Sequence, residues 1–211
     1  KEEFFDAINQ VGVAAAQEGS KPILTGILFD TKDGKTNLVA TDSYRLATKE
    51  LTNFSSQNIG VVSKKALNEV VRLFEESESE ISLLVEERQI FFDDGNYQVS
   101  LRKIEGEYPK YKELFPKETV FSVETEKGKI LEALDRSSVV AEGYIPIKLS
   151  FSEESLIITS LNQDIGGGKE EVSCKILGVD VKEIESFEMS FNPTYLMEAI
   201  GALFGSKVYL R

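Results

Sequence analysis

Two stretches of the chain carry apolar residues at the three- and four-residue steps of an amphipathic helix. The first is predicted over residues 3–17, before Lys21-Pro22, from the apolar positions Phe4, Phe5, Ile8, Val11 and Ala15. The second is predicted to begin after Ser63, a residue type that favours the N-cap position, and to bury Leu67, Val70, Val71 and Phe74. Each predicted helix therefore has one apolar face to bury.

Strand-like segments joined by short turns fill the chain between and after these helices. They are residues 27–29, 38–40, 45–51 and 60–62 before the second helix, and 81–85, 90–92 and 97–104 after it. Lys32-Asp33-Gly34-Lys35 and Asp94-Gly95-Asn96 have the composition of tight turns. Because about three strands follow each helix through short turns, the pattern favours an antiparallel α+β fold with its helices on one face.

The pattern then restarts. FFDAINQ at 4–10 aligns with ILEALDR at 130–136, an offset of 126, and SKKALNEVV at 63–71 aligns with NPTYLMEAI at 192–200, an offset of 129. Two matches in the same order at nearly constant offset predict tandem copies of one domain. On this alignment position 211 corresponds to about position 82, so we expect the second copy to stop before its last strands, in a piece of a longer chain.

Composition narrows the chemistry. The 211 residues include 36 acidic and 24 basic residues, one cysteine and no histidine, with a net charge of −12. The absence of histidine excludes Ser-His-Asp and Cys-His catalysis, and a single cysteine permits neither an internal disulfide nor a cysteine-based zinc site. That cysteine count, with no apolar run long enough to span a membrane, predicts a cytoplasmic protein. The acidic balance argues against broad nucleic-acid adhesion but allows a local basic strip.

Four segments carry a family resemblance, in this order: KPILTGILFD (21–30), LVATDSYRLA (38–47), LRKIEGEYPKYKELFP (101–116) and FNPTYLMEAI (191–200). Together they resemble the bacterial sliding clamp family, the β subunit of DNA polymerase III. The resemblance implies the DNA clamp fold, in which each tandem domain packs two helices on antiparallel sheets. It assigns residues 1–118 to a middle domain and residues 119–211 to a third domain that is incomplete at its C-terminal end. Family chains have three such domains, and two chains close head-to-tail into a ring around duplex DNA, so a homodimer is expected at full length.

The segment VATDSYRLA, residues 39–47, has two interpretations. In the first it is only a turn, in which Asp42 and Ser43 bond to their own backbone and Tyr44 covers the edge of the core. In the second, implied by the resemblance, it is one wall of a pocket between the middle and third domains. Clamps bind short linear motifs there, typically a glutamine followed by aliphatic and aromatic residues, from the DNA polymerase III catalytic subunit, the clamp loader and other clamp-binding proteins.

Carried over to this sequence, the implied partner-peptide-binding residues are Leu24, Thr41, Ser43, Tyr44, Arg45, Leu46, Pro109 and Leu114, with Asn192 and Tyr195 from the third domain. Leucine, proline and the alkyl stem of arginine suit an apolar slot for the hydrophobic anchors of a motif. The segment 104–116, punctuated by glycine and proline, is expected both to link the domains and to supply Pro109 and Leu114 to the pocket.

The resemblance also implies that helices line the central hole and that their basic residues meet phosphates without reading bases. The candidate DNA-facing residues are Lys21, Lys64, Lys65, Arg72, Lys127, Lys129 and Arg136. Ordinary solvated helix charge is an equally good interpretation of any one of them.

Three functions compete at this stage. The leading one is a non-catalytic processivity factor that encircles DNA and tethers the polymerase. The second is a clamp-like adaptor that binds peptides and never encircles DNA. The third is a magnesium-dependent enzyme, which the sequence disfavours because no D-x-D or similar acidic pair follows a strand in a glycine-rich turn. We expect no catalytic residue, no metal site and no cofactor, and we expect the glycine-rich stretch 165–171 to be a flexible loop rather than a phosphate loop, since the spacing GxxxxGK[ST] fails.

Overall fold

The computed structural model describes residues 1–19, 21–52, 54, 57–119, 121–141, 145–152, 154–162, 166–179 and 187–211. The chain divides into two compact units, Lys1–Leu114 and Phe115–Arg211, here called unit 1 and unit 2. Each unit is described by itself.

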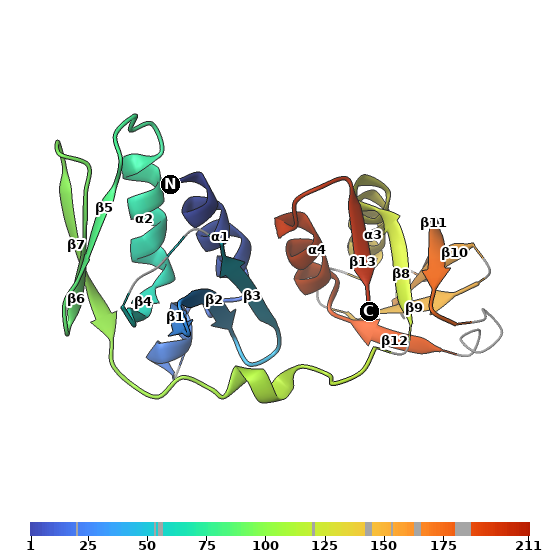
Figure 1. The fold of residues 1–211 in the computed structure, drawn as a ribbon. Helices are drawn as coiled ribbons and strands as arrows, with labels where there is room; N and C mark the ends of the chain where they lie inside the picture. Colours follow the sequence, from blue (N-terminus) through green and yellow to red (C-terminus); the bar gives the residue numbers. More distant parts are fainter. Residues whose placement is uncertain are drawn as a thin grey trace. The chain divides into compact units, whose positions relative to one another are not determined.

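Unit 1 is a seven-stranded antiparallel sheet with two helices on one face. Its elements are α1 (Glu2–Gly12), the 3-10 turn η1 (Pro22–Thr25), β1 (Gly26–Lys32), β2 (Lys35–Thr41), β3 (Leu46–Leu51), β4 (Gly60–Ser63), α2 (Lys64–Phe74), β5 (Ser82–Val85), β6 (Gln89–Asp93), β7 (Gln98–Ile104) and η2 (Tyr111–Leu114). The strand order is β3-β2-β1-β4-β7-β6-β5, and α1 and α2 lie side by side over β1 to β4 (Figure 1).

Unit 2 repeats this plan. Its elements are β8 (Ser122–Glu126), α3 (Lys127–Val140), β9 (Ile147–Phe151), β10 (Ser155–Asn162), β11 (Gly166–Leu177), β12 (Glu188–Phe191), α4 (Pro193–Ala202) and β13 (Lys207–Leu210). The sheet order is β12-β9-β10-β11-β8-β13. From α3 to β13 the elements follow one another as they do from α1 to β5, and the sub-order β11-β10-β9-β12 matches β3-β2-β1-β4. The predicted tandem repeat and the antiparallel α+β class are confirmed.

The β1–β2 hairpin of unit 1 is buried on both faces. Phe29 and Leu38 point to the helices and belong to the main core, which also holds Ile8, Leu67 and Phe74. Alternation along a strand sends the neighbouring side chains to the opposite face. Val39 and Val61 lie on that outer face and are nevertheless buried, as are Leu24 and Tyr111, and none of the four belongs to the helix-side core. A second, smaller apolar layer therefore covers the outer face of the sheet.

Turn residues behave as predicted at both hairpins. Asp33 and Gly34 have φ of 52° and 78° between the paired residues Lys32 and Lys35, the conformation that an Asp-Gly pair adopts readily. Asp94 accepts backbone hydrogen bonds from Asn96 and Tyr97 at 3.0 and 2.8 Å, which closes the β6–β7 turn. Two predicted turns are thus confirmed, one through the positive φ of its Asp-Gly pair and the other through side-chain hydrogen bonds to its backbone.

Two local predictions are wrong and one is confirmed. Helix α1 ends at Gly12 rather than near residue 17, because the chain then tightens into turns and Ala16 donates its N–H to the carbonyl of Leu24 at 2.9 Å. The predicted N-cap of α2, Ser63, is confirmed, although its side chain makes no capping hydrogen bond. Of the predicted loop 165–171, Ile165 lies outside the described residues, and the rest forms the start of strand β11, paired with β10.

Helix α3 of unit 2 buries a hydroxyl group at a position where α1 of unit 1 buries an apolar side chain. Ser137 on α3 is 2% exposed, and its Oγ has no hydrogen-bond partner in the described part of the chain. Its counterpart in unit 1, 126 positions earlier, is Val11, which is 1% exposed. Ser137→Ala should stabilise the chain by about 1 kcal/mol, because it removes an unsatisfied buried polar group. Urea unfolding measures the change.

The control is Ser138→Ala on the exposed side of the same helix turn, where the hydroxyl donates to the Asp135 carbonyl at 2.7 Å. Ser138→Ala gains the same helix propensity but loses a satisfied bond, so it should change the free energy of unfolding little. Equal stabilisation by both changes would contradict the assignment of a penalty to the Ser137 hydroxyl.

Candidate functional site

The loop between β2 and β3 is held by its own side chains. Asp42 accepts backbone hydrogen bonds from Tyr44 and Arg45 through Oδ1 at 2.9 and 3.0 Å, and its Oδ2 accepts from Arg45 Nε at 3.0 Å. Thr41 Oγ1 donates to the carbonyl of Arg45 at 2.7 Å and accepts from the N–H of Ser43 at 3.1 Å. Ser43 has φ of 81°, which completes the tight reversal. The turn predicted for this sequence is present.

The side chains of this loop do not cover the core. Tyr44 is 83% exposed, so its ring stands on the surface rather than over the core edge. Thr41 and Leu46 are paired across the β2–β3 ladder, and alternation places both on the outer face of the sheet. The Arg45 side chain is only 18% exposed beside Asp42. The simple turn interpretation therefore accounts for the backbone and leaves the exposed tyrosine unexplained.

Residues 105–114, which we call the strap, lie over the outer face of the same sheet. Tyr108 Oη donates to the Val39 carbonyl at 3.3 Å, and burial raises the pKa of Tyr108 to about 12. Tyr111 Oη donates to Asp30 Oδ2 at 2.6 Å, and Lys112 Nζ lies 2.7 Å from the same oxygen. These contacts fix the strap to β1 and β2 and bring Pro109 to the outer face.

Leu24 and Pro109 line one pocket of about 480 Å³ on this face. Its walls are η1 and the strap, namely Lys21, Pro22, Ile23, Leu24, Glu105, Gly106, Glu107, Tyr108, Pro109 and Lys110. Leu114, at the end of the strap, is 65% exposed. The structure thus brings Leu24 to Pro109, and Thr41 to Leu46, with Tyr108 joining the strap to β2. The anchoring residues Asp30, Tyr108, Tyr111 and Lys112 were missed from the sequence, where the only signal was two tyrosines flanking Pro109.

Asn192 and Tyr195 belong to unit 2. Asn192 is the N-cap of α4, and its Oδ1 accepts from the backbone N–H of Tyr195 at 3.1 Å. Both side chains are half-buried. Their place in a pocket with residues of unit 1 stays a prediction.

Most of the predicted DNA-facing cations already have contacts within the chain. Acidic partners lie close to three of them: Arg72 with Glu69 at 2.5 Å, Lys129 with Glu126 at 2.8 Å and Arg136 with Glu170 at 2.8 Å. The stem of Lys64 lies against Gly12 of α1, while Lys65 and Lys21 are exposed. An internal acidic partner weakens the pull of a cation on a phosphate, and the DNA-facing role of these residues stays a prediction.

Lys127 has a structural contact that occurs in both units. Its Nζ donates to the carbonyl of Gly201 at 2.9 Å and to that of Leu203, at the C-terminal end of α4. Lys1, 126 positions earlier, donates in the same way to the carbonyls of Glu75 (3.0 Å) and Ser77 at the end of α2. All three residues of each contact are related by one offset. A cation at a helix C-terminus satisfies orphan carbonyls and the helix dipole, so this lysine latch joins the two helices of each unit.

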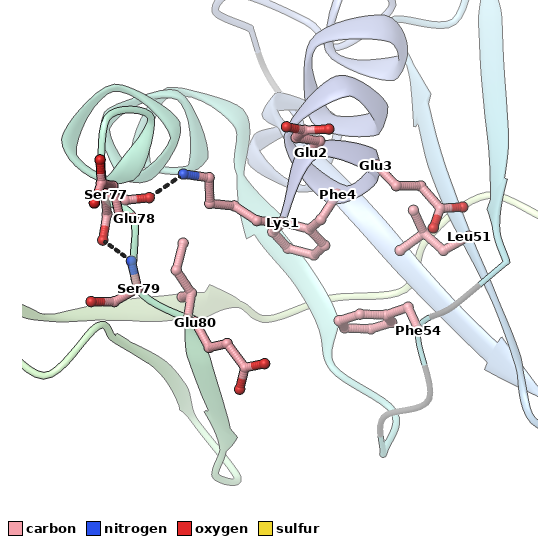
Figure 2. A pocket seen from close by; sticks show the side chains of 11 residues that line it. Lys1, Glu2, Glu3, Phe4, Leu51, Phe54, Ser77, Glu78, Ser79 and Glu80 are labelled. Carbon is pink, nitrogen blue, oxygen red and sulfur yellow. Dashed lines mark hydrogen bonds between the residues drawn. The ribbon is translucent and has the colours of Figure 1, made fainter.

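A second pocket, of about 630 Å³, lies at the N-terminal end of α1 (Figure 2). The rings of Phe4 and Phe54 are stacked in it with centroids 5.4 Å apart, and Leu51 and Ile81 line it beside the edge strands β3 and β5. In unit 2 the corresponding position holds a strand: β8 directly precedes α3 and pairs with β11 and β13, the counterparts of β3 and β5. We assign this pocket no ligand.

Within the described ranges, no group of three or more acidic or cysteine side chains is placed to hold a metal ion. None of the helices in those ranges has the length and apolar character needed to span a membrane.

Two copies of one helix-backed antiparallel domain, joined in tandem, define a repeat protein of the DNA-clamp class. The family described as DNA polymerase III beta subunit, central domain, matches residues 1–110, and its C-terminal domain matches residues 112–211. The chain belongs to the DNA polymerase III beta subunit family.

The relatives of this chain include beta sliding clamps, in agreement with the family match. The beta sliding clamp of Staphylococcus aureus (strain Mu50) is 30% identical over 209 residues, which are 96% of this chain and 54% of that protein. The beta sliding clamp of Streptomyces coelicolor is also 30% identical, over 210 residues. The crystal structure of the Bacillus subtilis DNA polymerase sliding clamp has a TM-score of 0.88 at 27% identity, over 99% of this chain and 55% of that one. The chain spans about half the length of the curated relatives it matches.

The lysine latch can be tested in unit 2. Lys127→Met keeps the stem but leaves two helix-terminal carbonyls without their donor, and it should destabilise the chain by about 1–2 kcal/mol. Lys129→Met is the matched control, because it removes only an exposed ion pair two positions along the same helix and should cost less than about 0.5 kcal/mol. Urea unfolding compares the two, and equal losses would contradict the latch.

Proposed function

We propose that this chain is part of a sliding clamp, a non-catalytic processivity factor that encircles duplex DNA as a ring of two full-length chains and tethers the DNA polymerase III catalytic subunit. The clamp loader and other clamp-binding proteins dock on the same molecule through short linear motifs. Family membership and the beta sliding clamp names of the relatives support this function.

The peptide site we propose is the outer face of unit 1. The observation that carries it is the shared pocket of Leu24 and Pro109, on the same face of the sheet as the outward pair Thr41 and Leu46. An apolar pocket with backbone groups and hydroxyls on the same face suits a peptide that inserts aliphatic and aromatic anchors. The exposed Tyr44 and Leu114 add apolar area at its margin.

The DNA contact that we propose is weak. Grip comes from the closed ring, so strong phosphate contacts would only slow sliding. The cations on the helices fit that need, because Arg72, Lys129 and Arg136 each carry an acidic partner. The net charge of −12 keeps DNA away from the rest of the surface.

The peptide site predicts a specific loss of affinity. Leu46→Ala and Arg45→Ala should each weaken binding of a synthetic peptide, carrying a glutamine followed by aliphatic residues and phenylalanine, by about tenfold, because each removes part of the apolar wall. Calorimetry with the full-length protein measures the affinity. Lys49→Ala, farther along β3, is the control and should leave binding unchanged. Wild-type affinity in both wall variants would exclude this surface as the peptide site.

The ring predicts topological binding to DNA. Full-length protein loaded on nicked circular DNA should stay bound at salt concentrations that abolish ion-pair contacts, and it should dissociate when the circle is cut. Gel filtration of the loaded DNA before and after linearisation measures this. Retention that falls with salt and does not depend on circularity would favour the adaptor that binds peptides without encircling DNA.

A further inference from the structure

We infer that Asp30 is a positioning residue for the peptide site, holding the strap so that Pro109 stays opposite Leu24; this rests on the proposed function. The inference begins from the second apolar layer on the outer face of unit 1, which the strap covers.

Asp30 lies on the outward side of β1, between the core-facing Phe29 and Thr31. Its Oδ2 accepts from Tyr111 Oη at 2.6 Å and lies 2.7 Å from Lys112 Nζ. Lys112 also lies over the ring of Tyr111, 5.5 Å from its centroid. The Tyr111 hydroxyl and the Lys112 ammonium group thus meet at one carboxylate oxygen. The contacts to Lys112 and Tyr111 lower the pKa of Asp30, so the carboxylate stays charged at neutral pH.

Pro109 needs such neighbours because a proline has no N–H to donate and the side chain of Pro109 is exposed. Its place is set by the anchors on either side. Tyr108 bonds to Val39 on β2, and Tyr111, whose N–H donates to the Pro109 carbonyl at 2.7 Å, bonds to Asp30 on β1. Neither Asp30 nor Tyr111 lines the pocket. A change at Asp30 therefore reaches a bound peptide through the strap and not through direct contact.

The experiment combines two readouts on the full-length protein. Asp30→Asn keeps the size of the side chain and removes its charge. It should raise amide hydrogen exchange across residues 105–114 and weaken the glutamine-aliphatic-phenylalanine probe peptide by about tenfold, since charged hydrogen bonds are the stronger ones. Exchange in α1 and α2 should not change. Lys112→Met, which keeps the Asp30–Tyr111 bond, should give a smaller change of the same kind.

The control is Glu50→Gln, which removes an acid from an exposed ion pair with Lys35 on the same sheet and should alter neither readout. Faster amide hydrogen exchange in the strap with unchanged peptide affinity overturns the inference and leaves the proposed function standing. Exchange that rises equally in the helices assigns Asp30 a general structural role and also overturns it. Failure of the unchanged protein to bind the probe contradicts the proposed function itself, and it would be seen before any variant is compared.

Discussion

Burial of the β1–β2 hairpin on both faces is the constraint on which the arrangement of unit 1 depends. One face packs under α1 and α2 through side chains such as Phe29 and Leu38, and the other is covered by the strap through Val39 and Tyr111. A sheet with only one covered face would leave these outward apolar residues in water. Because a segment from the far end of the unit must cover them, Pro109 comes to lie beside Leu24. The pocket is a consequence of how the second face is closed.

The repeat shows which features of the domain are structural. The lysine latch recurs at one offset in all three of its residues, so it belongs to the helix pair and not to either unit's special role. At Gly26 there is no room for a side chain. A Cβ there would lie 2.8 Å from the Val62 carbonyl and 2.5 Å from Val61 Cγ1. Only glycine lets β1 approach β4 this closely just after Leu24. The latch therefore maintains the helix pair of both units, whereas Gly26 lets two neighbouring strands of unit 1 pack closely.

Sequence reasoning predicted what local pattern determines. The hairpin at Asp33-Gly34 and the second helix follow from turn chemistry and periodicity. It failed where a contact between residues far apart in the sequence determines the local structure. Helix α1 ends early because Ala16 bonds to Leu24 in η1, and the glycines after residue 165 enter a strand because they pack against β10, where a Cβ on Gly168 would meet Ser160 Oγ at 2.9 Å. The anchors Asp30 and Tyr111 are 81 positions apart, and no spacing rule links them. For the candidate site, the family resemblance indicated residues such as Leu24 and Pro109, and the structure showed the strap that brings these two together.

The internal pairing of the helix cations bears on how such a surface would treat DNA. A free lysine presents a full charge, and a row of them would bind phosphates strongly and release many counterions. Here Arg136 is held by Glu170, whose carboxylate pKa is lowered by that contact, so the pair stays ionised and its field falls off as a dipole rather than as a charge. Lys127 is turned to helix carbonyls instead of solvent. Cations paired in this way attract a polyanion weakly, which fits the proposed ring, with its topological hold, better than it fits a protein that must bind an open duplex by charge.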